Sequence, residues 1–279
     1  MDMDMDTEQL EDLVRGHGLW EHREAILAAS RPAIYMYLGA AGQGETGRSR
    51  IGGIPDLPAS LPWPRDPLGR HLRFILQVAF AHLPEYPGSP LPVRGMLYLF
   101  ADDMEHRAEQ VVVYTGSEPL WPRHADPGAE FVTDWYDGLV PHRLEFQLAA
   151  DVPRWATSDF HALCEALGPD GEDRLGDLAS ELSEDSVGRL LGHVAGIGVD
   201  PREDAYVARE VNPAWVYDYA KRAALDMSRA ASWHNLLEVD SSRAVNLAFS
   251  DSGYLQVLVH EDDLRRQDFS RVYVNVESS

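Results

Sequence analysis

The chain has 279 residues, of which 44% are hydrophobic, and it carries a formal net charge of −22. This length allows a sizeable core, and this apolar content excludes a wholly disordered protein. The charge argues against nucleic acid as a partner, because binding a phosphate backbone requires a basic footprint.

The first residues and the single cysteine indicate the compartment. Residues 1–6 alternate Met and Asp, which is neither the basic start nor the apolar segment of a secretory signal. Cys164 is the only cysteine, so neither an internal disulfide nor a cysteine metal cage is expected. No stretch approaches the roughly 18 apolar residues of a membrane span. We therefore expect a cytoplasmic protein without a membrane partner.

The first quarter of the chain predicts two helices, a strand and a rigid connection. An amphipathic helix can start at Asp6 or Thr7, and a second helical piece covers residues 21–29. Residues 31–38, rich in Ile and Tyr, are typical of a strand. Residues 51–68 contain five prolines and no regular period, which indicates an extended connection.

The rest of the chain predicts more strands, separated by helices. Apolar spacing favours helices at 159–167 and 175–191, and Asn212-Pro213 is a typical start for a helix extending to about Ala231. Strands are predicted at residues 72–80, 96–101, 110–114, 234–239, 245–249, 254–259 and 271–276.

Two groups of these strands resemble each other. Each has a strand, a second strand that begins after a glycine (Gly95 or Gly253), an acidic pair (Asp102-Asp103 or Asp262-Asp263) and a further strand. We interpret the pattern as an internal duplication. Two copies are too few for a solenoid, which needs about three or more repeats.

These elements predict an α+β fold: a duplicated, mostly antiparallel sheet unit with helices at the N-terminus and in a central insertion. We divide the chain into an N-terminal helical segment (1–30), a first sheet-containing half (31–156), a helical insertion (157–231) and a second sheet-containing half (232–279). We expect these parts to form one compact unit.

The glycine loop at residues 42–49 has the spacing of a phosphate-binding motif. Gly42, Gly44 and Gly47 fit the dinucleotide pattern, and Arg48 and Ser49 stand where a phosphate loop has Lys and Ser or Thr. Both motifs need a helix directly after the loop. Here glycines and a proline follow, so we predict that the loop binds no nucleotide.

No other pattern predicts a catalytic residue, a cofactor or a metal site. The eleven histidines lack metal-ligand spacing, and no nucleophile elbow occurs. His161 and Cys164 share one helical turn, where a structural thiol is favoured over a Cys–His nucleophile. The acidic pairs could bind a cation, and turn or cap roles are the favoured alternative.

The segment 170–185 is the most acidic part of the chain. It holds seven carboxylates, and Arg174 is its only counter-charge. Such a segment is either a solvated helix face or an electrostatic docking surface. As a docking surface it would bind a basic protein through Asp177, Glu181 and Glu184.

The proline-rich stretch and the strands around it resemble the YwqG-like family, a bacterial domain of unknown function. The resemblance rests on residues 49–58, Trp63-Pro64, Gln77 and 91–97, and more loosely on 190–193 and 249–253. It extends from Ser49 to Val274. It implies an α+β fold with a duplicated sheet unit and an association with toxin–immunity gene neighbourhoods. The family's second glutamine is Glu238 in this chain.

Two functions remain open. The first is a non-enzymatic binding protein, immunity- or antitoxin-like, that recognises a basic protein partner. The alternative is a small-molecule-binding protein or enzyme that uses a cleft between the two halves, lined by Arg50, Trp63, Gln77 and Asp251. Gln77 could instead satisfy backbone groups near the proline-rich connection.

Overall fold

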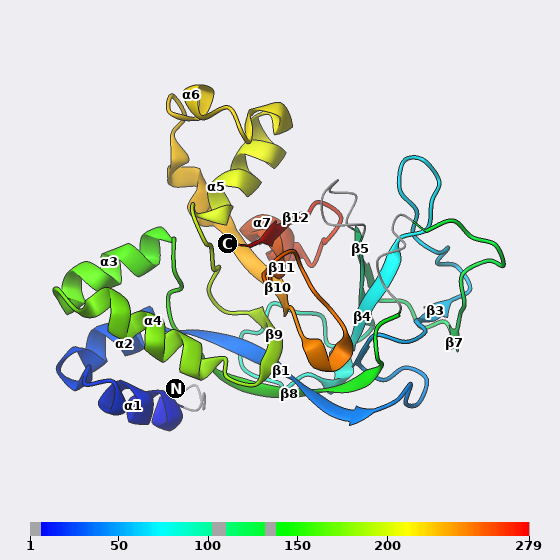
Figure 1. Ribbon diagram of the computed structural model, residues 1–279, viewed down its shortest axis with the longest axis horizontal. Helices are drawn as coiled ribbons and strands as arrows, with labels where there is room; N and C mark the ends of the chain where they lie inside the picture. The colour runs from blue at the N-terminus through cyan, green and yellow to red at the C-terminus, as the bar shows by residue number, and fades with distance from the viewer. Residues whose placement is uncertain (1–6, 102–109, 132–137, 279) are drawn as a thin grey trace.

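A computed structural model describes residues 7–101, 110–131 and 138–278 (Figure 1). Its α-helices are α1 (Thr7–Gly16), α2 (Arg23–Ala29), α3 (Ser158–Leu167), α4 (Gly171–Leu182), α5 (Pro201–Tyr206), α6 (Tyr219–Arg222) and α7 (Glu261–Arg266). Its strands are β1 (Arg31–Ala41), β2 (Arg50–Ile51), β3 (Asp56–Pro58), β4 (Arg73–Ala79), β5 (Met96–Ala101), β6 (Gln110–Tyr114), β7 (Leu120–Pro122), β8 (His142–Asp151), β9 (Ser186–Leu191), β10 (Trp233–Asp240), β11 (Tyr254–His260) and β12 (Tyr273–Glu277). The predicted α+β class is confirmed.

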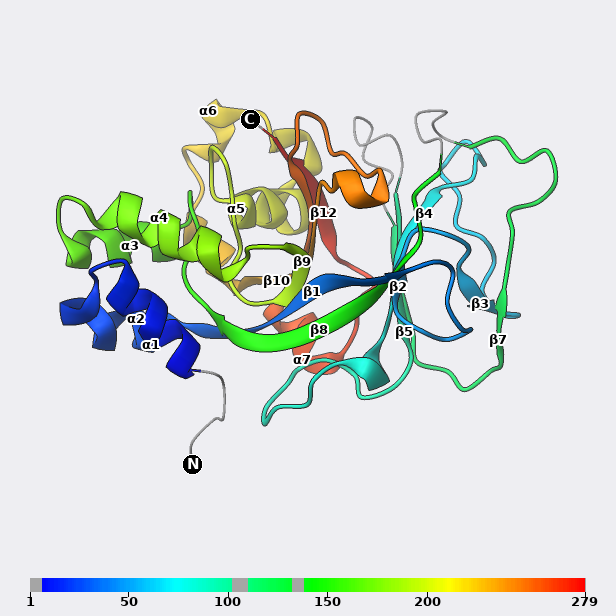
Figure 2. The ribbon, with the colours of Figure 1, turned by 60° about the horizontal axis from the view of Figure 1, so that its bottom comes forward.

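One ten-stranded sheet organises the molecule. Its strand order is β12-β11-β10-β9-β1-β8-β2-β4-β5-β6, and the pairings between these strands are antiparallel. The long strands β1 and β8 lie in the middle, as Figure 2 shows. A separate pair, β3 and β7, lies beside the β4–β5 end of this sheet. The predicted antiparallel character of the sheet is therefore confirmed.

The two strand groups that resemble each other in sequence lie at opposite ends of the sheet. The meander β4-β5-β6 ends one side, and the meander β10-β11-β12 ends the other. Counting outward from the central β1–β8 pair, β2 and β9 come first, and each is followed by its meander. This order is what a duplicated unit would produce, and the duplication remains our interpretation.

Apolar side chains from both ends of the sheet meet in one core. The largest buried cluster includes Ile75 and Leu97 from the first half together with Leu237 and Leu255 from the second. All four are fully buried. Burying such side chains stabilises the fold by about 1.5–3 kcal/mol each. Contacts between residues far apart in sequence thus stabilise the curled sheet.

Helices α1–α4 form a group at one end of the molecule (Figure 1). Leu10 and Val14 of α1 pack with Leu175 and Leu178 of α4 in a second buried cluster, which also includes Tyr35 of β1. These apolar residues recur every three or four positions, the spacing of one helix face. The opposite faces of α1 and α4 are therefore left to solvent.

Residues 186–191 correct the predicted helix at 175–191. The helix ends at Leu182, and Asp185 has a left-handed φ of 61°. The next six residues form β9, which pairs with both β1 and β10. Leu190 continues the helical spacing in the sequence, but in the structure it is buried in the core of the sheet. Packing at the centre of the sheet overrides the local helical pattern.

The predicted helix from Asn212-Pro213 to about Ala231 is also wrong. The segment forms a 3-10 turn (Pro213–Trp215), the short α6 and another 3-10 turn (Met227–Ser232). Asp218 and Asp226 interrupt it, because each side-chain carboxylate accepts a hydrogen bond from a backbone N–H two or three residues on. Aspartates favour such caps and turns over helix interiors.

Two further predictions need correction. Residues 245–249 form no strand: Asn246 is left-handed with φ 57°, while Val245 and Phe249 insert into the central core. The acidic pair Asp262-Asp263 lies in the first turn of α7 rather than in a turn between strands. Its counterpart, Asp102-Asp103, lies outside the described residues.

No helix within the described residues is long and apolar enough to cross a lipid bilayer.

Candidate functional site

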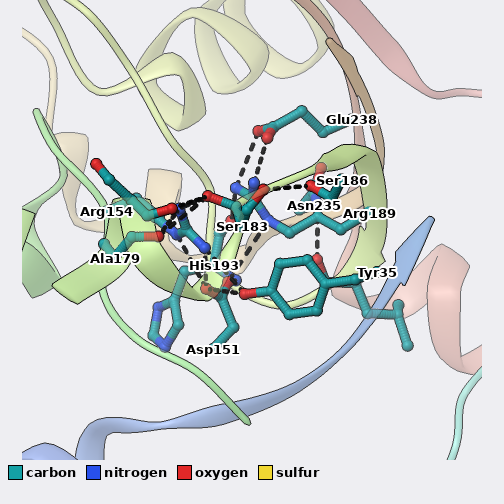
Figure 3. A network of polar contacts seen from close by, with 12 residues as sticks. Tyr35, Asp151, Arg154, Ala179, Ser183, Ser186, Arg189, His193, Asn235 and Glu238 are labelled. Atoms are coloured by element: carbon teal, nitrogen blue, oxygen red, sulfur yellow. Dashed lines mark hydrogen bonds and ion pairs between the residues drawn. The ribbon is translucent and has the colours of Figure 1, made fainter. Parts of the chain in front are cut away.

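A buried charge network lies where the helical group meets the sheet (Figure 3). Its centre is Asp151, the last residue of β8, which is fully buried. One carboxylate oxygen accepts hydrogen bonds from Tyr35 Oη at 3.0 Å and Arg154 Nε at 2.9 Å. The other accepts the backbone N–H of His193 at 2.7 Å. Asp151 thereby joins the two central strands to the loop that follows β9.

The close approach of this loop depends on Gly192. The glycine has a φ of 74°, and a Cβ built on it would lie 2.5 Å from the Asp151 carboxylate. Any side chain at this position would therefore push the loop away from Asp151. The glycine lets the His193 N–H reach the carboxylate.

The network has strongly perturbed ionisation. Burial alone would raise the pKa of Asp151, but the charges of Arg154 and Arg189 outweigh it and hold that pKa well below its usual range. Burial, together with the Asp151 charge, raises the pKa of Tyr35. Burial also lowers the pKa of His193 to about 4. At neutral pH the network thus contains an ionised Asp151 with a neutral tyrosine and a neutral histidine.

Arg154 ties helix α4 to the sheet. Its Nη1 donates to the backbone oxygen of Ala179 at 2.8 Å and to Ser183 Oγ at 3.2 Å, while its Nη2 donates to Asp151 at 2.6 Å (Figure 3). Arg154 is 8% exposed. The C-terminal end of α4 is therefore fixed by charge-assisted hydrogen bonds rather than by apolar contact alone.

The network continues across the second half of the sheet. Arg189 in β9 lies opposite Glu238 in β10, and Glu238 lies opposite Gln256 in β11. Arg189 makes a two-point contact with the Glu238 carboxylate, with Nη2 at 2.9 Å from Oε2. Gln256 Nε2 donates to the same oxygen at 3.1 Å. A row of polar side chains thus crosses three neighbouring strands.

The first half of the sheet contains a corresponding row. Arg50 in β2 lies opposite Gln77 in β4, and Gln77 lies opposite Tyr98 in β5. Arg50 forms an ion pair with the buried Asp56, with Nη1 at 2.8 Å from Oδ2. Gln77 accepts from the Asp56 N–H at 2.8 Å and donates to Arg48 O at 2.8 Å. The row fixes the start of the proline-rich connection.

The structure brings together two of the four residues expected to bind a small ligand. Arg50 and Gln77 face each other, and both are fully buried. Trp63 donates from its indole to Leu72 O at 2.8 Å and lines a separate hollow of about 290 Å³. Asp251 is exposed in the turn before β11. Ligand binding by this set stays a prediction.

The three residues expected to bind a protein partner are all exposed. Asp177 and Glu181 lie on the outer face of α4, and Glu184 follows its end. Glu181 also accepts a hydrogen bond from His17 Nε2 at 2.8 Å, which joins α4 to the end of α1. These carboxylates therefore belong to a surface formed by both helices.

A titratable residue that the sequence pattern did not indicate lies beside the network. Asp240 ends β10, two residues after Glu238 and on the same face of the strand. Burial, followed by the charge of Glu238, raises the pKa of Asp240 to about 7, against the opposing charges of Arg189 and Arg154. A sequence signal existed in the alternating acids of Glu238-Val239-Asp240, which place both carboxylates on one face.

The structure also shows the surroundings of the other candidate sites from the sequence, which are the glycine loop, Cys164 and possible metal ligands. The glycine loop runs into β2 and not into a helix, and Gly47 N donates to Asp56 at 2.8 Å. Burial, followed by the charge of Glu172, raises the pKa of Cys164 to about 11, so the thiol is protonated at neutral pH. Among the described residues, no three His, Cys, Asp or Glu side chains are placed to hold a metal ion.

The fold and the network define an α+β protein built on one ten-stranded antiparallel sheet with a buried polar row in each half. Residues 49–277 match the model of a family described as a domain of unknown function, DUF1963, and the chain belongs to that family. No curated protein sequence matches the chain. The matched region contains both polar rows, whereas α1, α2 and β1 with Tyr35 precede it.

Proposed function

We propose that this protein is a non-enzymatic binding protein that recognises a basic protein partner through the acidic face of α1 and α4. The observation that carries this proposal is the exposure of carboxylates along both helices and the segment after α4. The exposed members are Glu8, Asp12, Glu172, Asp173, Asp177, Glu181, Glu184 and Asp185. Arg15 and Arg174 are the exposed bases among them, and each is paired with an aspartate.

The fixed position of α4 supports this proposal. Arg154 holds the helix to the sheet through Ala179 and Ser183, close to Glu181 and Glu184 in sequence. A surface that is already ordered loses less conformational entropy when a partner binds. Most side chains in the buried network are engaged with one another, which favours a supporting role beneath the surface over direct contact with a ligand.

Exposed Trp20 adds an aromatic contact to the same helical group. It lies between α1 and α2, is 42% exposed, and stacks with the guanidinium of Arg15 at 4.2 Å. Tryptophan is enriched at the energetic centres of protein interfaces. Acidic residues around such an anchor would steer a basic partner and fix its orientation.

We propose further that the chain is YwqG-like and that it has an immunity- or antitoxin-like role. The resemblance of residues 49–58, Trp63 and Gln77 supports the family name, and the family's gene neighbourhoods support the role. In such a role the protein would occupy a basic bacterial toxin in the cytoplasm by charge complementarity.

A partner is first captured from the source cells and identified. The test is then the rate at which this partner associates with the wild-type protein and with a variant. The triple variant Asp177→Asn, Glu181→Gln, Glu184→Gln should associate more slowly and with a weaker salt dependence, because rim charges act mainly on the association rate. Stability should change by only about 0.5 kcal/mol, as for other exposed substitutions. A partner that binds both proteins equally fast would remove α4 from the interface.

A matched control neutralises three exposed carboxylates outside the helical group. Glu85→Gln, Glu145→Gln and Asp251→Asn change the net charge by the same amount at exposed positions. This variant should associate at nearly the wild-type rate. Equal slowing by both variants would mean that the total charge, and not the α1–α4 face, governs the encounter.

Small-molecule binding is the second candidate function. It is favoured by the hollow of about 290 Å³ at Trp63, which Phe74 and Phe131 also line. Aromatic walls of this kind are common in ligand sites. Native mass spectrometry of freshly isolated protein would show a bound metabolite, and Trp63→Ala should release it.

A further inference from the structure

We propose a second binding site, for a small oxyanion such as a phosphate or carboxylate, in a pocket between the helical insertion and α7. The pocket has a volume of about 480 Å³. Arg209 and Arg229 come from the insertion, and Arg271 comes from the segment after α7. The start of β10 and the end of β11 supply Trp233 and His260.

The insertion side of the pocket is held in place by Glu210. This residue lies in a π-helical turn, Val207–Val211, a feature that often occurs at functional sites. Its carboxylate accepts a hydrogen bond from Trp233 Nε1 at 3.0 Å and pairs with Arg229 Nη2 at 2.5 Å. Trp233 is only 2% exposed, so Glu210 is anchored to the core.

The opposite side is held by Asp263 in α7. Asp263 is 2% exposed, and both of its carboxylate oxygens lie 2.8 Å from Arg271 Nη2. Arg266 Nη2 donates to the same carboxylate at 3.3 Å. Each oxygen of both anchored carboxylates therefore contacts at least one donor of the protein itself. Asp262, the third carboxylate that lines the pocket, pairs with Arg265 Nη2 at 2.8 Å.

The arginines have more donors than the carboxylates use. Arg229 and Arg271 each engage their carboxylate through Nη2, and their side chains are 62% and 67% exposed. Arg209 is exposed and makes no ion pair with the part of the chain that the structure describes. A guanidinium has five N–H donors in a planar fork that suits phosphate and carboxylate. Donors from both sides of the pocket thus remain for a bound anion.

His260 supplies one more donor. Its Nδ1 accepts the backbone N–H of Asp262 at 3.2 Å, which places the proton of the neutral ring on Nε2. Nε2 lies 3.9 Å from Glu210 Oε1, and the ring packs edge-on against Trp233 with centroids 5.6 Å apart. The pocket therefore combines guanidinium and imidazole donors in a protein whose net charge is −22.

Isothermal titration calorimetry with inorganic phosphate and with citrate tests the site. At least one anion should bind with one-site saturation, and Arg209→Gln should weaken that binding by about tenfold or more, since a charge-assisted bidentate contact is lost. Because Arg209 makes no ion pair in the described chain, this variant should keep its circular dichroism spectrum and its melting temperature.

Two further variants make the result decisive. Arg271→Gln, on the other side of the pocket, should also weaken anion binding. Arg15→Gln removes an equal charge from the distant helix α1 and should leave anion binding unchanged. Absence of saturable binding by both anions would overturn the proposal. So would wild-type affinity in Arg209→Gln and Arg271→Gln, or an equal loss in all three variants.

Discussion

Replacing Asp240 with asparagine should raise the free energy of unfolding at neutral and alkaline pH, and should change it little at about pH 4 or below. In the folded protein, burial and the charge of Glu238 raise the pKa of Asp240 from 3.8 to about 7, against the opposing charges of Arg189 and Arg154. Tyr254 in β11 lies opposite Asp240 in β10. Between these pH values the folded chain holds a proton that the unfolded chain has lost. The free energy of unfolding therefore falls as the pH rises from about 4 to about 7.

The pKa difference sets the size of the effect. About three pKa units at about 1.4 kcal/mol each give a ceiling of about 4 kcal/mol. Asp240 is partly exposed, so solvent screens part of this effect. We expect Asp240→Asn to gain about 2 kcal/mol over the wild type between about pH 4 and about pH 7.

Urea denaturation at several pH values measures this difference. The wild type should lose stability from about pH 4 to about pH 7, and Asp240→Asn should lose much less. Asp251→Asn, an exposed control, should follow the wild type. A constant difference between Asp240→Asn and the wild type at all pH values, or a wild type that gains stability over this range, would refute the reasoning.

Two other substitutions and one thiol reaction test the buried polar groups and the partly buried Cys164. Arg154→Ala leaves the Asp151 carboxylate buried with one counter-charge fewer, so it should destabilise the protein by about 3–5 kcal/mol in urea denaturation. Arg154→Lys should have an intermediate effect. A loss below about 1 kcal/mol in Arg154→Ala would contradict the stabilising role of the network. Gln77→Leu should cost about 1–3 kcal/mol, because it leaves the Asp56 N–H and Arg48 carbonyl unsatisfied, and an unchanged melting curve would argue against this role. Cys164, whose pKa is raised to about 11, should react with a thiol reagent far more slowly at mildly alkaline pH than a free cysteine does, and equal rates would contradict its protonated state.

The strands at both ends of the sheet could be predicted because their local pattern and their packing agree. Residues 96–101 are apolar, and residues 254–259 are apolar except for Gln256; both segments follow a glycine and form β5 and β11. The strand β9 could not be predicted, because Leu190 continues the helical spacing of α4. Its conformation is decided by pairing with β1 and β10, which depends on contacts distant in sequence.

The polar rows were only partly visible in the sequence. Gln77 and Glu238 occupy corresponding positions, and the replacement of glutamine by glutamate was apparent. The structure shows its context: Glu238 lies opposite Arg189 and pairs with it directly, whereas Arg50 pairs with Asp56. Their partners come from other strands and loops, so only the strand register could show which arginine faces which acid.

Hydrogen–deuterium exchange on the complex with the identified basic partner tests the central claim most directly. If the acidic face of α1 and α4 is the docking surface, exchange of backbone amides should slow in residues 7–16 and 171–185 when the partner binds. The amides beside the Trp63 hollow should exchange as in the free protein. Slowed exchange around Trp63, with none in α1 or α4, would contradict the proposed interface.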